Sequence, residues 1–437
     1  MRKVGLYTLG CKVSLYETEA VGEAFLAAGY TVCPFDEVCD VYVINTCTVT
    51  AESDAKSRKY IRRAIRKNPE AVVIVIGCYS QRAPDEVGKI EGVSAVIGTE
   101  DKMRCVQIAE NLLDSKFENR NSKLVRVTSL ENAVFEPMCI KSAPRTRAYV
   151  KIEDGCECKC TYCAISAARG PVRSKKPEQV ISEVEGLYKN GTLEIVLTGI
   201  ETGSYGADFE EKYDLADLIC QLDERHSCER IRLGSMAPEL LTAKFIDRIA
   251  DTKIMVPHFH ISMQSGSDNV IRGMKRRYNR KMALDNIARI REKMPEVMLT
   301  ADLMVGFPGE SEEDFLDTLA FVREAKLLDA HVFAYSKREG TPAATYENQV
   351  PEQVKKERSA RLIAECARVR DEALQSVIHS GKLLSVIMET KKGSSYHGHS
   401  DSYIEVSAES KKDLRGELVW VKPLRHEKGI IYGEIIT

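Results

Sequence analysis

Three cysteines that share one short loop are the residues of this chain best suited to metal chemistry. Cys156, Cys160 and Cys163 follow the spacing C-x3-C-x2-C. Three thiolates can ligate three irons of a 4Fe-4S cluster and leave the fourth iron open for a small molecule. Cys158 lies in the same loop, so a zinc site with C-x-C or C-x-C-x2-C spacing is the alternative. Of the two, the spacing favours the iron–sulfur cluster.

Cys11, Cys47 and Cys78 form a second, dispersed set with a shared structural position. Each comes directly after a predicted strand and before a predicted helix. Open α/β sheets bind ligands at that edge, and helix N-termini there favour thiolates. The alternative is three buried thiols that pack as small hydrophobic side chains, and spacing does not decide between the two. The remaining cysteines, apart from Cys158, are interpreted as structural.

The composition describes an ordinary folded chain in a reducing compartment. It has 437 residues, 43% of them hydrophobic and 29% charged, and 14 cysteines. In a chain of this size, metal binding explains the cysteines better than disulfides do. The N-terminus lacks the apolar run of a signal peptide, and no stretch of about eighteen apolar residues could span a membrane. We therefore expect a cytoplasmic protein with no membrane partner and, without a coiled-coil repeat, a monomer.

Cationic residues concentrate in three segments, although the net charge is only −2. These segments are residues 56–67, 169–176 and 272–281. For each segment alone, a solvated helix face is the ordinary explanation. Together they indicate a phosphate-binding surface, as a nucleic-acid partner would need.

The order of predicted elements indicates an α/β fold with three units. Residues 1–115 alternate apolar strands with helices, a pattern typical of a parallel α/β sheet. Residues 116–145 are polar and contain Pro137 and Pro144, so they are interpreted as a linker with room for one strand. The strands expected in the first unit are 4–9, 41–45, 71–76 and 94–97, and the helices are 15–28, 53–67, 85–91 and 102–114.

From residue 146 to residue 372 the alternation restarts with six strand–helix units. This pattern predicts a partial (β/α)6 barrel whose functional residues lie beyond the carboxyl ends of the strands. The loop with Cys156 follows the first of these strands, as the rule requires. The strands expected are 148–152, 194–198, 230–234, 258–263, 298–304 and 331–334, and the helices are 177–190, 214–224, 238–251, 281–293 and 312–325.

The last unit, residues 373–437, is entered through a charged helix predicted over 352–378. Short strands with polar turns predict a small β-barrel, an architecture common among nucleic-acid-binding domains. The strands expected are 384–389, 402–406, 417–421 and 429–435.

Several words of the sequence resemble the radical SAM methylthiotransferase family, over nearly the full length. GCKVSLYETEA, INTCTVT and GCYSQ resemble its N-terminal domain, and KIEDGCECKCTYC resembles its radical S-adenosylmethionine (SAM) loop. LTGIETGSYG, FHISMQSGSDNVIRGMKRRY and ADLMVGFPGE resemble its later barrel motifs, and the last unit takes the place of its RNA-binding TRAM domain. The resemblance implies two 4Fe-4S clusters. It assigns an auxiliary cluster to Cys11, Cys47 and Cys78 and the radical-generating cluster to Cys156, Cys160 and Cys163.

The same resemblance implies a reaction in which an unactivated C–H bond becomes C–S–CH3. One SAM methylates a sulfur of the auxiliary cluster, and a second SAM supplies the 5′-deoxyadenosyl radical that activates the carbon. A reductase and a sulfur source would be separate partners. The positions that would lie at SAM or its cluster are Tyr162, Thr198, Gly199, Glu201, Ser235, Gln264, Val305 and Gly306. Each of them could also be an ordinary loop or turn residue.

QSGSD followed by MKRRY resembles the tRNA branches of this family. HFHISMQSGSD and RVTSLENAVFE resemble the enzymes that act on N6-threonylcarbamoyladenosine (t6A). The implied function is conversion of t6A next to the anticodon to 2-methylthio-t6A, with the tRNA anticodon stem-loop as partner and segments 62–67 and 275–277 on its phosphates. Alternatives within the family act on isopentenyl-adenosine in tRNA or on a ribosomal-protein aspartate. An alternative of another class is a non-catalytic, metal-containing RNA-binding protein.

Overall fold

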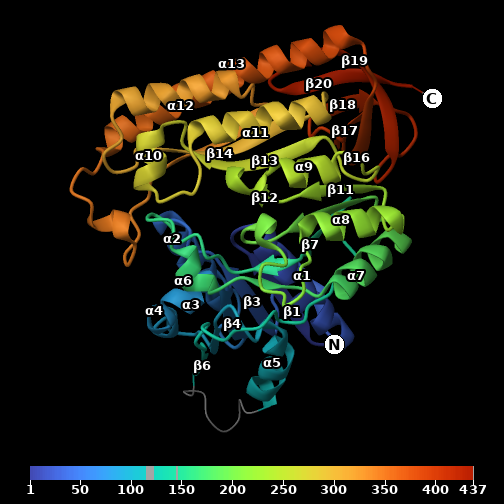
Figure 1. The fold of residues 1–437 in the computed structure, drawn as a ribbon. Coiled ribbons are helices and arrows are strands. Elements are labelled where there is room, and N and C mark those ends of the chain that lie inside the picture. Colours follow the sequence, from blue (N-terminus) through green and yellow to red (C-terminus); the bar gives the residue numbers. More distant parts are fainter. Residues whose placement is uncertain (115–122, 144–145, 437) are drawn as a thin grey trace.

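The computed structural model describes residues 1–114, 123–143 and 146–436, which form three successive units (Figure 1). The N-terminal unit is a six-stranded sheet of order β2-β1-β3-β4-β5-β6, and all neighbours in it are parallel. Its strands are β1 (Lys3–Thr8), β2 (Thr31–Cys33), β3 (Val41–Thr46), β4 (Val72–Gly77), β5 (Ala95–Ile97) and β6 (Leu124–Arg126). Its helices are α1 (Lys12–Ala27), α2 (Ala51–Lys67), α3 (Cys78–Arg82), α4 (Pro84–Gly88) and α5 (Cys105–Asp114), with a 3-10 turn at Lys102–Arg104 before α5.

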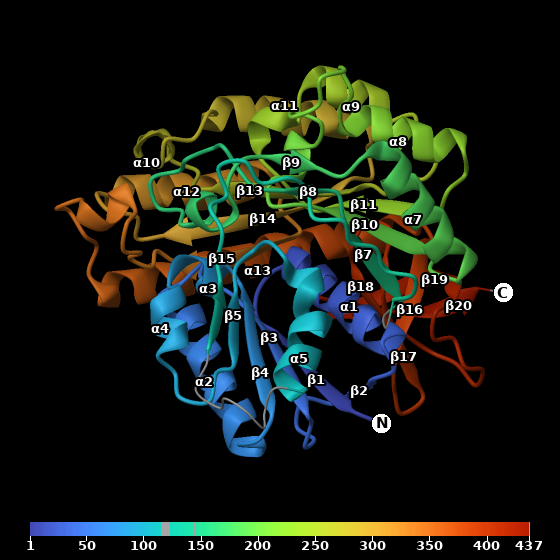
Figure 2. The ribbon, with the colours of Figure 1, turned by 90° about the horizontal axis from the view of Figure 1, so that it is seen from below.

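Helices cover both faces of this sheet because its central strands are apolar on both sides. β3 and β4 are buried at every position. Val43 and Ile74 pack with α1 and α5, whereas Ile44 and Val75 pack with α2, α3 and α4. Alternate side chains of a strand point to opposite faces, so an unbroken apolar run requires helices on either side of the strands (Figure 2).

The N-terminal unit differs from the prediction in short elements. The helix predicted over 85–91 is present as α4, which begins at Pro84 and ends at Gly88, and the short helix α3 before it was not expected. The predicted linker, 116–145, contributes β6 to the sheet, and its Met138 and Ile140 lie in the core of the next unit. Its residues 116–122, 144 and 145 lie outside the described part of the chain.

The central unit is a partial barrel of parallel strands that bends at one glycine. One sheet has the order β11-β10-β7 and the other β12-β13-β14-β15. Gly234 separates β11 from β12, and a Cβ there would lie 2.7 Å from Thr202 Oγ1, so the bend needs a residue without a side chain. The strands are β7 (Arg147–Lys151), β10 (Glu194–Thr198), β11 (Arg230–Leu233), β12 (Ser235–Met236), β13 (His258–Gln264), β14 (Met298–Val305) and β15 (Asp329–Ala334); β8 (Glu153–Asp154) and β9 (Arg173–Ser174) form a separate pair.

Helices surround this barrel as predicted, with one exception and two additions. The helix predicted over 238–251 is wrong: a 3-10 turn at Pro238–Leu240 precedes a shorter helix, α9 (Ala243–Ile249), whose N-cap Thr242 accepts a hydrogen bond from the Phe245 amide. Two short helices, α6 (Ile165–Arg169) and α10 (Asp268–Gly273), were not expected. The others are α7 (Pro177–Lys189), α8 (Leu215–Glu224), α11 (Arg280–Lys293) and α12 (Glu312–Glu324), and further 3-10 turns lie at Thr202–Ser204 and Pro342–Thr345.

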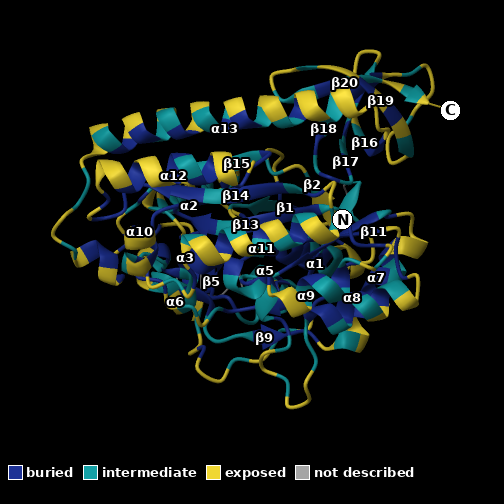
Figure 3. Ribbon diagram, turned by 45° about the horizontal axis from the view of Figure 1, so that its top comes forward, coloured by how far each residue is buried: buried dark blue, intermediate teal, exposed yellow. Residues whose placement is uncertain are grey.

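The C-terminal unit is a closed barrel of order β16-β17-β18-β20-β19, so the predicted β-barrel is confirmed, but its strand at Ser395–Ser400 was not expected. The long helix α13 (Glu352–Ser380) runs past α12 into it, and buried and exposed positions alternate along the helix (Figure 3). The strands are β16 (Leu384–Lys392), β17 (Ser395–Ser400), β18 (Glu405–Glu409), β19 (Leu418–Glu427) and β20 (Ile430–Ile436). The α/β fold class with a small β-barrel is confirmed. Over the residues that the structure describes, no helix is both long and apolar enough to cross a membrane.

Candidate active site

The first cysteine loop, residues 156–163, follows β7 and β8 at the carboxyl end of the barrel strands. Backbone and side-chain hydrogen bonds hold it at several points. The Cys156 amide donates to the Gly170 carbonyl at 3.0 Å. Thr161 donates from its hydroxyl to the Gly273 carbonyl (2.8 Å) and from its amide to the Met274 carbonyl (3.1 Å). The loop is therefore held to α6 at one end and to α10 in its middle, and this fixes the backbone that carries the three thiols.

A cation stands beside one of these thiols. Arg276 donates to Cys160 Sγ at 3.4 Å and to the Ser262 carbonyl at 3.0 Å, and its guanidinium lies 5.1 Å from the centre of the Tyr278 ring. Hydrogen bonds and positive charge at a thiolate stabilise a ligated anionic cluster. Arg276 lies in a segment predicted to touch tRNA phosphates, and the structure assigns it to the cysteine loop instead.

Cys158 lies close to Cys156, and a hydrogen bond joins their thiols. A hydrogen bond from Cys156 lowers the pKa of Cys158 to about 6, and the charge of Arg276 acts in the same direction. The same hydrogen bond raises the pKa of Cys156. In this arrangement Cys158 is the more readily ionised of the two thiols, so the loop holds a fourth thiol that could bind metal.

The second cysteine set lies at the carboxyl edge of the N-terminal sheet, where β1, β3 and β4 end. Cys11 caps α1, Cys47 follows β3, and Cys78 is the first residue of α3. A Cβ on Gly10, which has a φ of 130°, would lie 3.2 Å from Cys47 Cβ, so the Cys11 and Cys47 loops meet there. The charges of Cys11 and Cys47 both act on Cys78, and burial raises the pKa of Cys78 to about 11. Cys11 is exposed, so packing as a small hydrophobic residue does not explain its placement.

A buried ion-pair network joins the two cysteine sets. Arg169, which is fully buried on α6, donates from Nε to Cys78 Sγ at 3.1 Å. Its guanidinium also pairs with Glu17 on α1 and with Asp154, which lies two residues before Cys156 in the chain. Arg169 belongs to segment 169–176, which was expected to contribute to a phosphate-binding surface. That expectation is wrong for its arginines, because Arg169 and Arg173 are buried and paired.

Two adjoining cavities connect the cysteines with the barrel interior. A cavity of about 520 Å³ is bordered by Cys11 and, from the barrel strands, by Thr198, Gly199 and Ser235. A second cavity of about 360 Å³ is bordered by Cys163, Tyr162 and Gln264, and by Val49 and Thr50, which follow Cys47. Asp302 borders both. The structure therefore gathers five of the predicted SAM-site residues with members of both cysteine sets.

Glu201 and Val305 do not border these cavities. Glu201 is buried, and its Oε1 accepts from the Ala237 amide at 3.2 Å, while burial raises its pKa to about 8. The Val305 carbonyl accepts from the Tyr335 amide and the Gly306 amide donates to Glu310, so these two backbone groups already have partners.

The acidic group around Glu201 fits the cationic end of SAM. The Glu201 amide donates to Glu153 Oε2 at 2.9 Å, while Glu153 Oε1 and Glu239 Oε2 are buried and have no partner within the described residues. A Cβ on Gly199 would lie 2.3 Å from Glu153 Oε2, so glycine leaves the room that this carboxyl group needs. Buried acceptors without partners suit an ammonium donor, which the methionine part of SAM carries.

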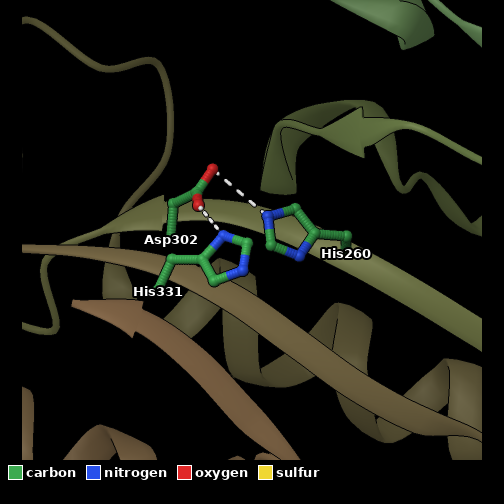
Figure 4. A group of neighbouring side chains, drawn as sticks. All are labelled: His260, Asp302 and His331. Atoms are coloured by element: carbon green, nitrogen blue, oxygen red, sulfur yellow. Dashed lines mark ion pairs between the residues drawn. The ribbon is translucent and has the colours of Figure 1, made fainter. Parts of the chain in front are cut away.

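Sequence reasoning missed a polar group inside the barrel. His260, Asp302 and His331 come from β13, β14 and β15, and Asp302 bridges the two rings (Figure 4). His260 Nε2 lies 3.2 Å from Asp302 Oδ2, and His331 Nδ1 lies 3.3 Å from Asp302 Oδ1. Among the described residues, only this group has three possible metal ligands whose atoms all lie within 4.8 Å of one another. The cysteine sets do not meet that distance, and each thiolate of a cluster binds a different iron, which keeps the sulfurs apart.

The fold and the first cysteine loop define the class of protein, a radical SAM enzyme. Residues 150–322 match the family model described as the radical SAM superfamily, and residues 3–98 match one described as uncharacterized protein family UPF0004. A solved radical SAM methyltransferase, TsrM from Kitasatospora setae, shares the fold with a TM-score of 0.59 at 16% identity, covering 79% of this chain and 77% of that one. The class implies SAM and one 4Fe-4S cluster as cofactors.

Full-length relatives narrow the assignment. The chain is 40% identical to the threonylcarbamoyladenosine tRNA methylthiotransferase MtaB of Bacillus subtilis (strain 168), over 97% of this chain and 94% of that protein. It is 34% identical to the MtaB of Aquifex aeolicus (strain VF5), over 96% and 99%. It is 31% identical to the tRNA-2-methylthio-N(6)-dimethylallyladenosine synthase of Alkaliphilus oremlandii (strain OhILAs), over 100% and 93%. The chain therefore belongs to the radical SAM methylthiotransferase family.

Proposed function

We propose that this chain is a tRNA methylthiotransferase that converts t6A next to the anticodon to 2-methylthio-t6A. The observation that carries the proposal is that both cysteine sets border the barrel interior, on two cavities that share Asp302. A C–H bond of an adenine base does not react with ordinary acids or nucleophiles, so a radical source and a sulfur source must reach the same carbon. The choice of t6A follows the 40% identity to a t6A enzyme, against 31% for the dimethylallyladenosine synthase cited above.

The cofactors of this proposal are two 4Fe-4S clusters and SAM. Cys156, Cys160 and Cys163 would hold the cluster that binds SAM, and Cys11, Cys47 and Cys78 would hold the auxiliary cluster. When bound together, a cluster and SAM supply a 5′-deoxyadenosyl radical that can remove a hydrogen atom from carbon. The donor sets fit, because each consists of thiols and each has an arginine that donates to one sulfur.

The protein's own residues hold and orient these groups. We propose that Glu153, Glu201 and Glu239 receive the ammonium group of SAM and that Tyr162 and Gln264 border its adenosine. Gln264 has a φ of 64°, which is costly for a residue with a side chain and typical of binding sites. Thr198, Gly199 and Ser235 would line the passage between SAM and the large cavity. Val305 would not contact SAM through its backbone and would only shape the end of β14.

The RNA partner would lie across more than one unit. On α2, Lys59, Arg62 and Arg66 are exposed and have no ion-pair partner in the part of the chain that the structure describes. We propose that they contact tRNA phosphates while the C-terminal barrel, residues 373–437, binds the anticodon stem. A base in the anticodon loop is only partly stacked, so it can enter the barrel at low cost. The enzyme would act as a cytoplasmic monomer and receive electrons and sulfur from separate proteins.

The decisive experiment is nucleoside mass spectrometry of tRNA from a strain that lacks the gene. Loss of 2-methylthio-t6A together with accumulation of t6A supports the proposal. If 2-methylthio-t6A persists and 2-methylthio-isopentenyl-adenosine disappears, the chain is the isopentenyl-adenosine enzyme instead. The protein purified without oxygen should contain about eight irons and eight sulfides. Zinc without sulfide would reject both clusters and point to a non-catalytic RNA-binding protein.

A further inference from the structure

The large cavity is lined mainly by polar and ionisable side chains, and its position makes it the place where a substrate would lie. It extends from Cys11 and the ends of β10 and β11 to Tyr403 and His399 of the C-terminal barrel. Its volume of about 520 Å³ is within the range of small-molecule sites. The chemistry of its wall therefore bears on which modified base it can accept.

A cluster of buried arginines includes Arg232, which borders the cavity. Arg147, Arg230 and Arg232 all pair with the buried carboxylate of Glu194, and Arg147 also pairs with Glu389. Arg232 pairs with Glu194 through two hydrogen bonds (2.8 and 3.1 Å), and its guanidinium lies 4.9 Å from the centre of the Tyr403 ring. The third nitrogen of Arg232, Nη1, is buried and has no partner within the described residues. Buried donors normally have partners, so this nitrogen indicates a missing acceptor.

Lys12 adds a second cation to the same cavity. It follows Cys11, borders the cavity with Arg232, and makes neither a hydrogen bond nor an ion pair with any described side chain. Burial and the charge of Arg232 lower the pKa of Lys12, and the carboxylate of Asp302 offsets only part of this effect. A half-buried lysine beside an arginine, with no carboxylate in ion-pair contact, is the environment that an anionic ligand would balance.

The histidines supply one acceptor and one donor to the cavity. Thr300 Oγ1 lies 3.0 Å from His258 Nε2 and 2.8 Å from His260 Nδ1. If His260 donates from Nε2 to Asp302, its Nδ1 must accept from the Thr300 hydroxyl, which in turn accepts from His258 Nε2. That assignment leaves Nδ1 of His258 as an acceptor, and this atom is buried and without a partner in the described structure. His331 donates from Nδ1 to Asp302, and this hydrogen bond raises the pKa of His331, which favours a protonated ring whose exposed Nε2 is a donor.

We propose that this cavity binds the amino-acid part of the threonylcarbamoyl group, with Lys12 and Arg232 on its carboxylate and His258 and His331 on its hydroxyl group. The inference rests on the proposed function and identifies residues that select the substrate within it. A threonylcarbamoyl group offers one anion and one hydroxyl group, which can donate to His258 Nδ1 and accept from His331 Nε2. An isopentenyl group offers neither, so it would leave the two cations and the two histidine nitrogens without a ligand partner. Sites built for a polar group reject analogues that lack it far more strongly than apolar pockets do.

Binding of synthetic anticodon stem-loops to the reconstituted full-length protein tests this assignment. Two stem-loops are compared under anaerobic conditions, one with t6A and one with the carboxamide of t6A, which keeps the shape but removes the charge. We expect the unsubstituted protein to bind the carboxylate form about tenfold to a hundredfold more tightly. Lys12→Met should reduce that ratio to near one at unchanged iron and sulfide content. Lys244→Met, which removes an exposed lysine from α9, should leave the ratio unchanged.

His331→Ala provides a second variant that is distant in sequence from the cluster cysteines. It should weaken binding of the t6A stem-loop severalfold, while a stem-loop with the glycine analogue, which lacks the hydroxyl group, should bind equally to both proteins. The cavity assignment is overturned if Lys12→Met still prefers the t6A stem-loop over its carboxamide and His331→Ala still prefers it over the glycine analogue, each as strongly as the unsubstituted protein does. This result would leave the proposed modification of t6A intact. A protein that modifies only isopentenyl-adenosine would instead overturn the proposed function. A stoichiometric third metal that is lost from His331→Ala would assign the His–Asp–His group to that metal and would also overturn the inference.

Discussion

Replacing Glu17 by glutamine should destabilise the protein more than any surface ion-pair variant, because this carboxylate is at the centre of a buried network. Glu17 is fully buried on α1, and its Oε1 lies 3.2 Å from Lys102 Nζ and 2.9 Å from Lys151 Nζ. Arg169 pairs with both of its oxygens. Lys102 belongs to the N-terminal unit, whereas Lys151 and Arg169 belong to the barrel, so the network lies on the boundary between the units.

The size of the effect follows from the charge balance. The network contains four cations, and four carboxylates balance them. Glu17→Gln keeps the shape and the amide can still accept a hydrogen bond, but one buried cation loses its counter-charge. Breaking a buried pair in this way costs about 3–5 kcal/mol. Since a folded domain is stable by only about 5–15 kcal/mol, the change should be easy to detect.

Urea denaturation of the reduced apoprotein at pH 7 measures this difference. Glu52→Gln is the matched control, because Glu52 also pairs with a lysine but is 74% exposed, so its loss should leave the urea midpoint nearly unchanged. If Glu17→Gln unfolds within 1 kcal/mol of the parent protein, the network does not stabilise the boundary and the reasoning fails.

The pH dependence gives an independent check with a definite sign. Burial raises the pKa of Glu17, but the charges of Arg169, Lys102 and Lys151 outweigh it and hold the pKa well below its ordinary value. A carboxyl group whose pKa is lower in the folded state stabilises the protein above the unfolded-state pKa of about 4.3, and this contribution is lost as the pH falls. The difference between parent and variant should thus be constant between pH 6 and pH 8 and shrink below about pH 4.

Three further predictions concern the clusters, SAM and RNA. Cys47→Ala and Cys160→Ala should each retain about four of eight irons, and the two remaining clusters should give different electron paramagnetic resonance spectra; one shared spectrum would contradict two separate sites. Gly199→Ala should abolish SAM binding in equilibrium dialysis while the iron content stays unchanged, because the new methyl group would displace Glu153. Arg62→Ala with Arg66→Ala should weaken binding of t6A and unmodified tRNA equally. The double substitution should also make the slope of log binding constant against log salt concentration about two less steep. An unchanged slope would show that α2 does not contact RNA phosphates.

The long helices and strands could be predicted because the pattern of apolar residues along each of them is unambiguous. β3 and β4 are apolar runs buried at every position, and repeated strand–helix alternation indicates parallel strands in both the N-terminal and the central unit. Short elements could not be predicted in the same way. β2 and β6 have three residues each and are mostly exposed, so they carry no period that separates them from a loop. α6 and α10 have five and six residues, too few to show a helical period, and backbone carbonyls at their C-terminal ends accept hydrogen bonds from the first cysteine loop.

The parts of the site that lie within one short segment could be predicted from the sequence. The parts that are assembled from distant strands could not. Spacing favoured an iron–sulfur site for the loop with Cys156, and a shared position after three strands singled out the dispersed set, whose cluster is implied only by the family resemblance; both assignments stay predictions. Arg169 and Arg276 looked like surface cations, because a one-dimensional charge count cannot distinguish a solvated guanidinium from one that pairs with a buried carboxylate or thiol. The His–Asp–His group was missed because its members lie on three strands and each is an ordinary residue in its own segment.

The buried network has a structural role that stability alone would not justify. A buried ion pair is often no more stabilising than apolar side chains of the same volume, so this many charges at one boundary needs another explanation. Arg169 contacts Cys78, and its partner Asp154 begins the loop that carries Cys156. Charged pairs are directional, whereas apolar surfaces can slide, so the network fixes one cysteine set relative to the other. Under the proposed function, a radical made at one set would have to meet a substrate that receives sulfur at the other, and reactions of this kind tolerate displacements of less than about 1 Å. The network is therefore better understood as the device that positions the two sites than as a source of folding free energy.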